Sequence, residues 1–171
     1  MKKLEEFIRD VPDFPKKGIV FKDITPLIAD GPAFKRVIRE LHGHYRDRKI
    51  DKVVAVESRG YIFGAPLAER LGAGLVIARK PGKLPAKTVR ESYSLEYGTA
   101  SLEMHQDAIE KNERVIIVDD LLATAGTAHA VRQLVLRLGG KLVEFGFVIE
   151  LSFLNGRDRL APARIYSLIK Y

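Results

Sequence analysis

The sequence predicts an α/β fold with a central, mainly parallel, twisted sheet flanked by helices. Short apolar runs rich in β-branched residues alternate with longer amphipathic segments, and the clearest run covers residues 115–118. Such runs are typical of strands covered on both faces, and their alternation with helices is typical of parallel sheets. A chain of 171 residues can bury about 70% of its unfolded surface in one domain. We therefore expect a single domain over residues 1–171.

The expected elements follow one another after a first segment of about thirty residues that does not show this alternation. Helices are predicted at 34–45, 62–71 and 127–138, and strands at 52–56, 75–78, 115–118, 142–150 and 165–169. The first helix has one apolar face, and the third should end at Gly139 and Gly140. Residues 93–104 contain two strand-like segments around Tyr97 and Gly98, which predicts an antiparallel hairpin.

Two adjacent acids, Asp119 and Asp120, follow the strand at 115–118, and a loop of small residues covers 123–127. Ligands of open α/β sheets bind at the carboxyl ends of the strands. The loop lets backbone N–H groups approach an anion, and the next helix points its positive end at the same place. The acids can accept hydrogen bonds from vicinal hydroxyls. This order predicts a site for a phosphorylated sugar; the alternative is an acid pair that caps a helix beside an ordinary tight turn.

A second anion site is predicted at residues 57–60, where the strand at 52–56 ends. The guanidinium of Arg59 could bind a diphosphate in a fork geometry, although it could also be a surface arginine beside a turn. The common nucleotide cradles are excluded, because the chain has no GxxxxGK[ST] motif and its only GxG is followed by Ile77 where a glycine is required.

Composition narrows the class of protein further. The net charge is +7, but the basic residues are dispersed rather than grouped in a block, so we expect no nucleic-acid partner. The chain has no cysteine, which excludes disulfides and thiolate chemistry. No apolar run approaches the roughly 20 residues that span a bilayer. We expect a cytoplasmic protein that does not enter a membrane.

Five segments together resemble the type I phosphoribosyltransferases, in the form that acts on adenine. They are DFPKKGIVFKDITPL (13–27), ESRGYIFGAPLA (57–68), RKPGKLP (79–85), SYSLEYGTASLEMHQDAI (92–109) and VDDLLATAGTA (118–128). The resemblance implies Mg²⁺-dependent transfer of phosphoribosyl from phosphoribosyl diphosphate to N9 of adenine, giving AMP and pyrophosphate. It also implies a homodimer, and a small hood of about residues 1–30 over the base site of a core at about 31–171.

The resemblance assigns roles to individual residues. It implies contacts with phosphoribosyl diphosphate or AMP for Ser58, Arg59, Arg79, Lys80, Lys83, Asp119, Asp120, Ala123, Thr124, Ala125, Gly126 and Thr127. It implies contacts with adenine for Val20, Phe21, Lys22 and Leu121. Catalytic roles fall to Glu96, Arg59, Asp119 and Asp120, although Glu96 could also be a solvent-facing strand residue. The resemblance also implies that Mg²⁺ is held mainly by substrate and water, with help from Asp119 or Asp120, and that the Glu57-Ser58 peptide is cis.

Two positions bear on specificity and on how far the resemblance holds. The family usually has two glycines in the phosphate loop, whereas here Ala125 precedes Gly126. If φ of Ala125 is positive, strain of about 1 kcal/mol is expected. Enzymes for 6-oxopurines carry an acid where Ala123 stands, so Ala123 favours adenine. The alternatives are a 6-oxopurine phosphoribosyltransferase and a non-catalytic regulator that keeps the phosphoribosyl-diphosphate pocket.

Overall fold

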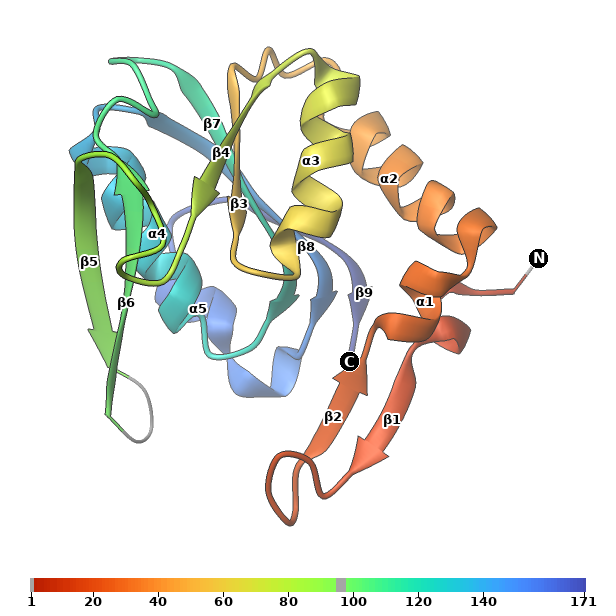
Figure 1. Ribbon diagram of the computed structural model, residues 1–171. Helices are drawn as coiled ribbons and strands as arrows, with labels where there is room; N and C mark the ends of the chain where they lie inside the picture. Colours follow the sequence, from red (N-terminus) through yellow and green to blue (C-terminus); the bar gives the residue numbers. More distant parts are fainter. Residues whose placement is uncertain (1, 95–97) are drawn as a thin grey trace. The chain divides into compact units, whose positions relative to one another are not determined.

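The apolar run at 115–118 lies at the centre of a five-stranded parallel sheet in the computed structural model, which describes residues 2–94 and 98–171 (Figure 1). The strand order is β4-β3-β7-β8-β9. Their bounds are β3 (Lys52–Val56), β4 (Gly74–Ala78), β7 (Arg114–Leu122), β8 (Lys141–Glu150) and β9 (Ile165–Lys170). All four neighbouring pairs are parallel, which confirms the predicted fold class.

The direction in which strands are added reverses between β3 and β7. From β3 the chain adds β4 on one side, and from β7 it adds β8 and β9 on the other. Neighbouring strands whose connections run in opposite directions leave a crevice at their carboxyl ends, where open α/β sheets bind ligands. The end of β3 leads into residues 57–60, and the end of β7 leads into the loop at 123–127, so the two predicted anion sites meet at this crevice.

The helices of this sheet cover opposite faces. Helix α3 (Gly60–Leu71) connects β3 to β4, and α4 (Gly126–Arg137) connects β7 to β8. Gly64 of α3 lies against Val53 and Ala55, whereas Val54 belongs to the core cluster that includes residues of α4. Because alternate residues of a strand point to opposite faces, these contacts place the two helices on different sides.

Strand β7 is longer than the sequence predicts and contains both acids. Its pairing with β8 continues through Asp119↔Phe147 to Leu122↔Glu150. The prediction that the strand ends at Val118 was therefore wrong, because parallel pairing with a long neighbour outweighs the low strand propensity of aspartate. Helices α3 and α4 also begin one or two residues earlier than predicted, at glycines.

The predicted hairpin is confirmed as β5 (Thr88–Ser94) and β6 (Thr99–His105), which pair antiparallel. The first strand begins five residues before the expected start at Tyr93, and one bridge, Arg79↔Glu103, joins β6 to the segment after β4. Between β8 and β9 the sequence analysis missed a 3-10 turn, Ser152–Leu154, and the short helix α5 (Gly156–Leu160). Among the described residues, no helix combines the length and apolarity needed to cross a membrane.

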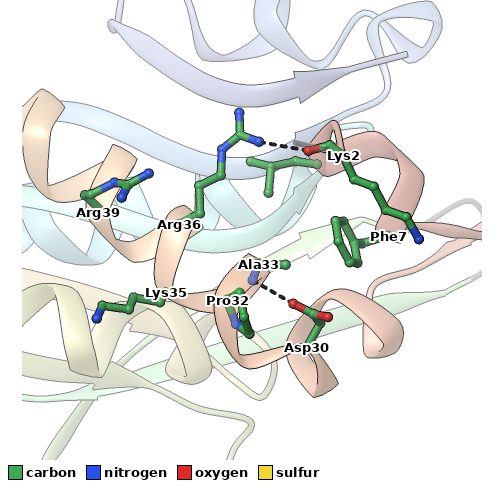
Figure 2. A pocket seen from close by; sticks show the side chains of 9 residues that line it. Lys2, Phe7, Asp30, Pro32, Ala33, Lys35, Arg36 and Arg39 are labelled. Atoms are coloured by element: carbon green, nitrogen blue, oxygen red, sulfur yellow. Dashed lines mark hydrogen bonds between the residues drawn. The ribbon is translucent and has the colours of Figure 1, made fainter.

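The chain forms two compact units, Met1–Glu40 and Leu41–Tyr171. The first contains a 3-10 turn (Leu4–Phe7), the antiparallel strands β1 (Arg9–Pro12) and β2 (Val20–Asp23), helix α1 (Thr25–Ala29) and most of α2 (Gly31–Tyr45). It holds a cavity of about 330 Å³ whose lining includes the apolar residues Leu4, Phe7 and Ala33 and the basic residues Lys2, Lys35 and Arg39. Figure 2 shows this lining. None of the predicted site residues lines this cavity.

Candidate functional site

The acid pair lies at the end of β7 in an environment that favours one ionised carboxylate over two. Asp120 is 7% exposed, and its backbone N–H donates to Asp119 Oδ1 at 2.8 Å. Burial, followed by the negative charge of Asp120, raises the pKa of Asp119 well above its usual value. The backbone of Gly60 lies close by, since a Cβ there would be 2.9 Å from Asp119 Oδ1.

An ion pair joins the two predicted anion sites. Arg59, which precedes α3, donates from Nε to Oδ2 of Asp120. The two residues are 61 positions apart in the sequence, and the adjacency of β3 and β7 brings them together. Ser58 is exposed beside Arg59, and the Glu57-Ser58 peptide is cis, as the family resemblance implied. The site therefore combines carboxylates and a guanidinium at one crevice.

The predicted phosphate loop turns sharply into α4. Ala125 has φ 67° and ψ 7°, which is the left-handed conformation, and is 5% exposed. His129 N donates to Ala125 O at 2.9 Å. The N–H groups of a first helical turn have no partners within the helix, so they are available to an anion. The loop geometry thus fits the expected anion site. Because φ of Ala125 is positive, we expect backbone strain of about 1 kcal/mol at this residue.

The strain at Ala125 predicts opposite tolerances for two substitutions. Ala125→Gly should change the free energy of unfolding by less than about 1 kcal/mol, because relief of strain offsets the greater freedom of glycine in the unfolded chain. Ala125→Val should cost about 2 kcal/mol or more, because a β-branched residue is a rare outlier at positive φ. Denaturant unfolding of both variants checks this. Equal losses in the two variants would contradict the assignment of strain to φ.

The hairpin reaches the phosphate loop through Tyr93. Thr127 Oγ1 donates to Tyr93 Oη at 3.2 Å, and a Cβ on Gly126 would lie 3.2 Å from Cδ2 of the Tyr93 ring. No individual role was predicted for Tyr93, although the polar–aromatic alternation of 92–94 indicates a strand with one aromatic face. Tyr97, Glu96 and the rest of 95–97 lie outside the described residues.

Two acids that the sequence analysis did not select hold the basic segment at 79–83. Glu57 accepts hydrogen bonds from Arg79 Nη2 at 3.0 Å and from Lys80 N at 2.8 Å, and the bond from Arg79 lowers the pKa of Glu57. Glu103, 4% exposed, accepts from Gly82 N at 3.1 Å. The backbone N–H groups of Lys80 and Gly82 therefore have carboxylate partners. No local sequence signal identifies these acids, because all three bonds depend on which strands are neighbours.

These contacts turn Arg79 inward. Its Nη1 donates to Lys83 O at 3.2 Å, and its guanidinium also binds Glu57, whereas Lys80 and Lys83 are exposed. In this structure the side chain of Arg79 thus shapes the segment, while the two lysine side chains are exposed to solvent. A ligand contact by any of the three stays a prediction.

The donor set fits a divalent cation that is held mostly by substrate and water. Among residues 2–94 and 98–171, no group of three or more histidine, aspartate or glutamate side chains could enclose a metal ion. Asp119 and Asp120 are the acidic pair at the crevice, and their mutual repulsion contributes to the raised pKa of Asp119. A cation nearby would relieve that repulsion. One or two carboxylates plus substrate phosphates is the usual way in which proteins bind Mg²⁺.

The raised pKa of Asp119 predicts how stability depends on pH. Between the pKa of about 3.9 in the unfolded chain and the higher folded value, the folded state binds more protons, so the free energy of unfolding falls as pH rises. Asp119→Asn removes this fall, because an asparagine side chain does not titrate. The amide oxygen can still accept the hydrogen bond from the Asp120 N–H group, so that contact is kept. Without ligand, the variant should have a higher melting temperature than the parent at pH 7, by roughly 2–4 °C for each kcal/mol gained in the free energy of unfolding. The difference in melting temperature should vanish near pH 3. Thermal unfolding from pH 3 to 8 measures this; parallel curves would contradict it.

The predicted base-site residues are divided between the two units. Val20, Phe21 and Lys22 lie on β2, where Val20 is 49% exposed. The Phe21 ring packs edge-on against Phe14 at 5.2 Å between centroids, and Lys22 Nζ binds Asp10 Oδ1 at 2.7 Å. Leu121 lies on β7 and is partly buried. Phe14 was not among the predicted contacts.

Comparisons with known proteins agree with this architecture. The phosphoribosyl transferase domain family matches residues 27–166. The adenine phosphoribosyltransferase of Geotalea daltonii is 57% identical over 171 residues and covers 100% of both chains, and that of Chloroflexus aurantiacus is 56% identical over 168 residues, 98% of this chain and 97% of the relative.

Solved structures give the same result. The crystal structure of adenine phosphoribosyltransferase from Thermoanaerobacter pseudethanolicus superposes with a TM-score of 0.95 at 55% identity, covering 99% of this chain and 100% of that one. The enzyme from Saccharomyces cerevisiae, complexed with adenine and an imino-altritol bisphosphate, has a TM-score of 0.91 at 40% identity and 96% coverage of each chain. The chain therefore belongs to the phosphoribosyltransferase family, in the group of the adenine phosphoribosyltransferases.

Proposed function

We propose that the protein transfers the 5-phosphoribosyl group from phosphoribosyl diphosphate to N9 of adenine, giving AMP and pyrophosphate. The observation that carries this proposal is the ion pair between Arg59 and Asp120 at the crevice between β3 and β7. It joins the loop at 57–60 to the acid pair at the end of β7, which supports a diphosphate site beside a site for the ribose hydroxyls. The relatives named adenine phosphoribosyltransferase support the choice of substrate.

In the proposed reaction, N9 bonds to C1′ of the ribose as the bond from C1′ to the pyrophosphate oxygen breaks. Pyrophosphate leaves with the electron pair, positive charge develops on the ribose ring, and adenine loses the imidazole proton. Arg59, Lys80 and Lys83 neutralise the diphosphate, which is electrostatic stabilisation of the leaving group. Ser58 lies beside the same diphosphate. Glu96 takes the proton or stabilises the charge of the ribose.

The remaining residues fix the sugar so that C1′ meets the base in line. Asp119 and Asp120 accept hydrogen bonds from the ribose hydroxyls, and the loop from Ala123 to Thr127 binds the 5′-phosphate. Such positioning converts a bimolecular reaction into one between held partners, which lowers the barrier by several kcal/mol. The hairpin of β5 and β6 excludes water from the site, so that water does not react at C1′ of the ribose in place of adenine. Val20, Phe21, Lys22 and Leu121 bind adenine.

We further propose that Mg²⁺ binds with the substrate and that Asp119 or Asp120 contacts it through water. When bound, Mg²⁺ neutralises charge on the diphosphate. The acid pair, in which the charge of Asp120 helps to raise the pKa of Asp119, supports a cation close to these two carboxylates. The resemblance to the family supports a homodimer that works in the cytoplasm.

The test is AMP formation from adenine, phosphoribosyl diphosphate and Mg²⁺, with hypoxanthine and guanine assayed in parallel. Product from adenine alone supports both the reaction and the choice of base. Product from a 6-oxopurine would contradict the role given to Ala123, which carries no acid to contact such a base. Binding of phosphoribosyl diphosphate without product from any base would favour a regulator.

A further inference from the structure

The turn that begins α5 lies directly behind the phosphate loop. Gly156 is buried, and a Cβ placed on it would lie 2.2 Å from the carbonyl oxygen of Ala123 and 3.0 Å from Leu122 Cδ1. No real side-chain carbon approaches a backbone oxygen at such a distance. The φ of Gly156 is not in the left-handed region, so glycine is needed here for close approach and not for its conformational freedom.

The position of the Ala123 carbonyl decides where the next N–H group points. The peptide bond between Ala123 and Thr124 is trans, and in a trans peptide the C=O and N–H bonds point in opposite directions. Because the Ala123 oxygen faces Gly156, the Thr124 N–H points away from α5. Within the described part of the chain, no group accepts a hydrogen bond from that N–H. It is therefore available to an anion in the loop.

Side-chain hydrogen bonds hold helix α5 in place at both of its ends. Arg157 donates from Nε and Nη2 to the two carboxylate oxygens of Glu150, at 2.7 and 2.8 Å. Glu150 ends β8 and is 3% exposed. At the other end of α5, Arg132 of α4 donates from Nη1 to Leu160 O at 3.3 Å. A bidentate arginine–carboxylate pair fixes orientation as well as distance, so α5 presents Gly156 to the loop from a defined place.

We propose that Gly156 and Arg157 are positioning residues for the 5′-phosphate site. The turn at Gly156 receives the Ala123 carbonyl, which keeps the Thr124 N–H directed at the bound phosphate, and the Arg157–Glu150 pair holds the turn in place. Neither residue touches substrate. This inference rests on the proposed function, because it assigns the phosphate of the ribosyl group to the loop at 123–127.

The test compares Gly156→Ala with the parent in the full chain, using ribose 5-phosphate and pyrophosphate as separate probes in titration calorimetry. The new methyl group must displace the Ala123 carbonyl, so affinity for ribose 5-phosphate should fall at least about tenfold, as small misplacements of binding groups do. Affinity for pyrophosphate should not change. Gly43→Ala is the matched control, because nothing lies within 4 Å of a Cβ at Gly43; this variant should bind both probes as the parent does.

Arg157→Lys provides a second, milder variant in case Gly156→Ala does not fold. Lysine keeps the charge but cannot make the two-pronged bond to Glu150, so ribose 5-phosphate should bind more weakly while pyrophosphate binding is kept. A lower melting temperature with unchanged affinity for ribose 5-phosphate in either folded variant would show a merely structural role and overturn the inference. If the parent chain forms no AMP from adenine and phosphoribosyl diphosphate, the proposed function fails and the positioning role with it; if the parent forms AMP but binds no ribose 5-phosphate, only the positioning role is overturned.

Discussion

The Asp120→Asn variant is expected to lose about 100-fold or more in kcat/KM while it keeps its fold, because one charged hydrogen-bonding group at a developing charge is worth that much. Asp120 is 7% exposed at the end of β7, and its ion pair with Arg59 joins two parts of the candidate site. It accepts from Arg59 and, in the proposed reaction, from a ribose hydroxyl. An asparagine retains the shape but loses the charge, so it weakens both interactions at once.

The measurement is steady-state kinetics with adenine and phosphoribosyl diphosphate, accompanied by thermal unfolding to show that the fold is intact. Asp47→Asn is the matched control, because the Asp47 side chain is 86% exposed and pairs only with the neighbouring Arg46 among the described residues. The control should leave the kinetics unchanged. Unchanged kinetics in Asp120→Asn would refute the hydroxyl-binding role of this acid.

Gly64→Ala is expected to lower the free energy of unfolding by about 1–3 kcal/mol, the usual cost of overpacking a core. Gly64 lies on the face of α3 that packs on β3, and a Cβ there would be only 2.5 Å from Ala55 Cβ. The contact is between two short, rigid groups, so neither can turn aside. The helix must move away from the sheet, and with it the loop that carries Arg59, so activity should fall as well.

A size exchange tests whether this contact is the cause. Adding Ala55→Gly to Gly64→Ala removes the facing methyl group and should restore part of the lost stability, less roughly 0.5–1 kcal/mol for a glycine in a strand. Gly43→Ala is again the control, because it places a methyl group in open space on a helix. Alanine is a better helix former than glycine, so this variant should raise the free energy of unfolding by up to about 1 kcal/mol. Equal melting temperatures for Gly64→Ala and Gly43→Ala would contradict the close packing of α3.

The fold was largely predictable because its signals are local. A run such as Val115 to Val118 is apolar over consecutive residues only if both faces of the strand are covered, and this predicts a parallel sheet before any neighbour is known. Small residues after two acids likewise predict an anion loop at the strand end. The hairpin was predictable for the same reason, although β5 begins earlier than the pattern of residues 93–104 indicated.

Contacts between distant segments escaped the sequence analysis. Glu57 binds the segment after β4, Tyr93 meets the phosphate loop, and Gly156 approaches Ala123, each across a long stretch of chain. Nothing in the sequence around these residues indicates a partner, because each contact depends on which strands are neighbours and how far they extend. Even the end of β7 was misjudged, since its pairing with β8 carries the strand through both acids.

The sequence by itself therefore determined the α/β class and predicted where the two candidate anion loops and the acid pair fall, because backbone periodicity and loop composition are local properties. Only the tertiary structure decided that β3 and β7 are neighbours with connections running in opposite directions, which places Arg59 on Asp120. It also decided that Ala125 takes a positive φ. Strand order and close backbone contacts are set by the free energy of the whole packed sheet, and no single segment carries that information.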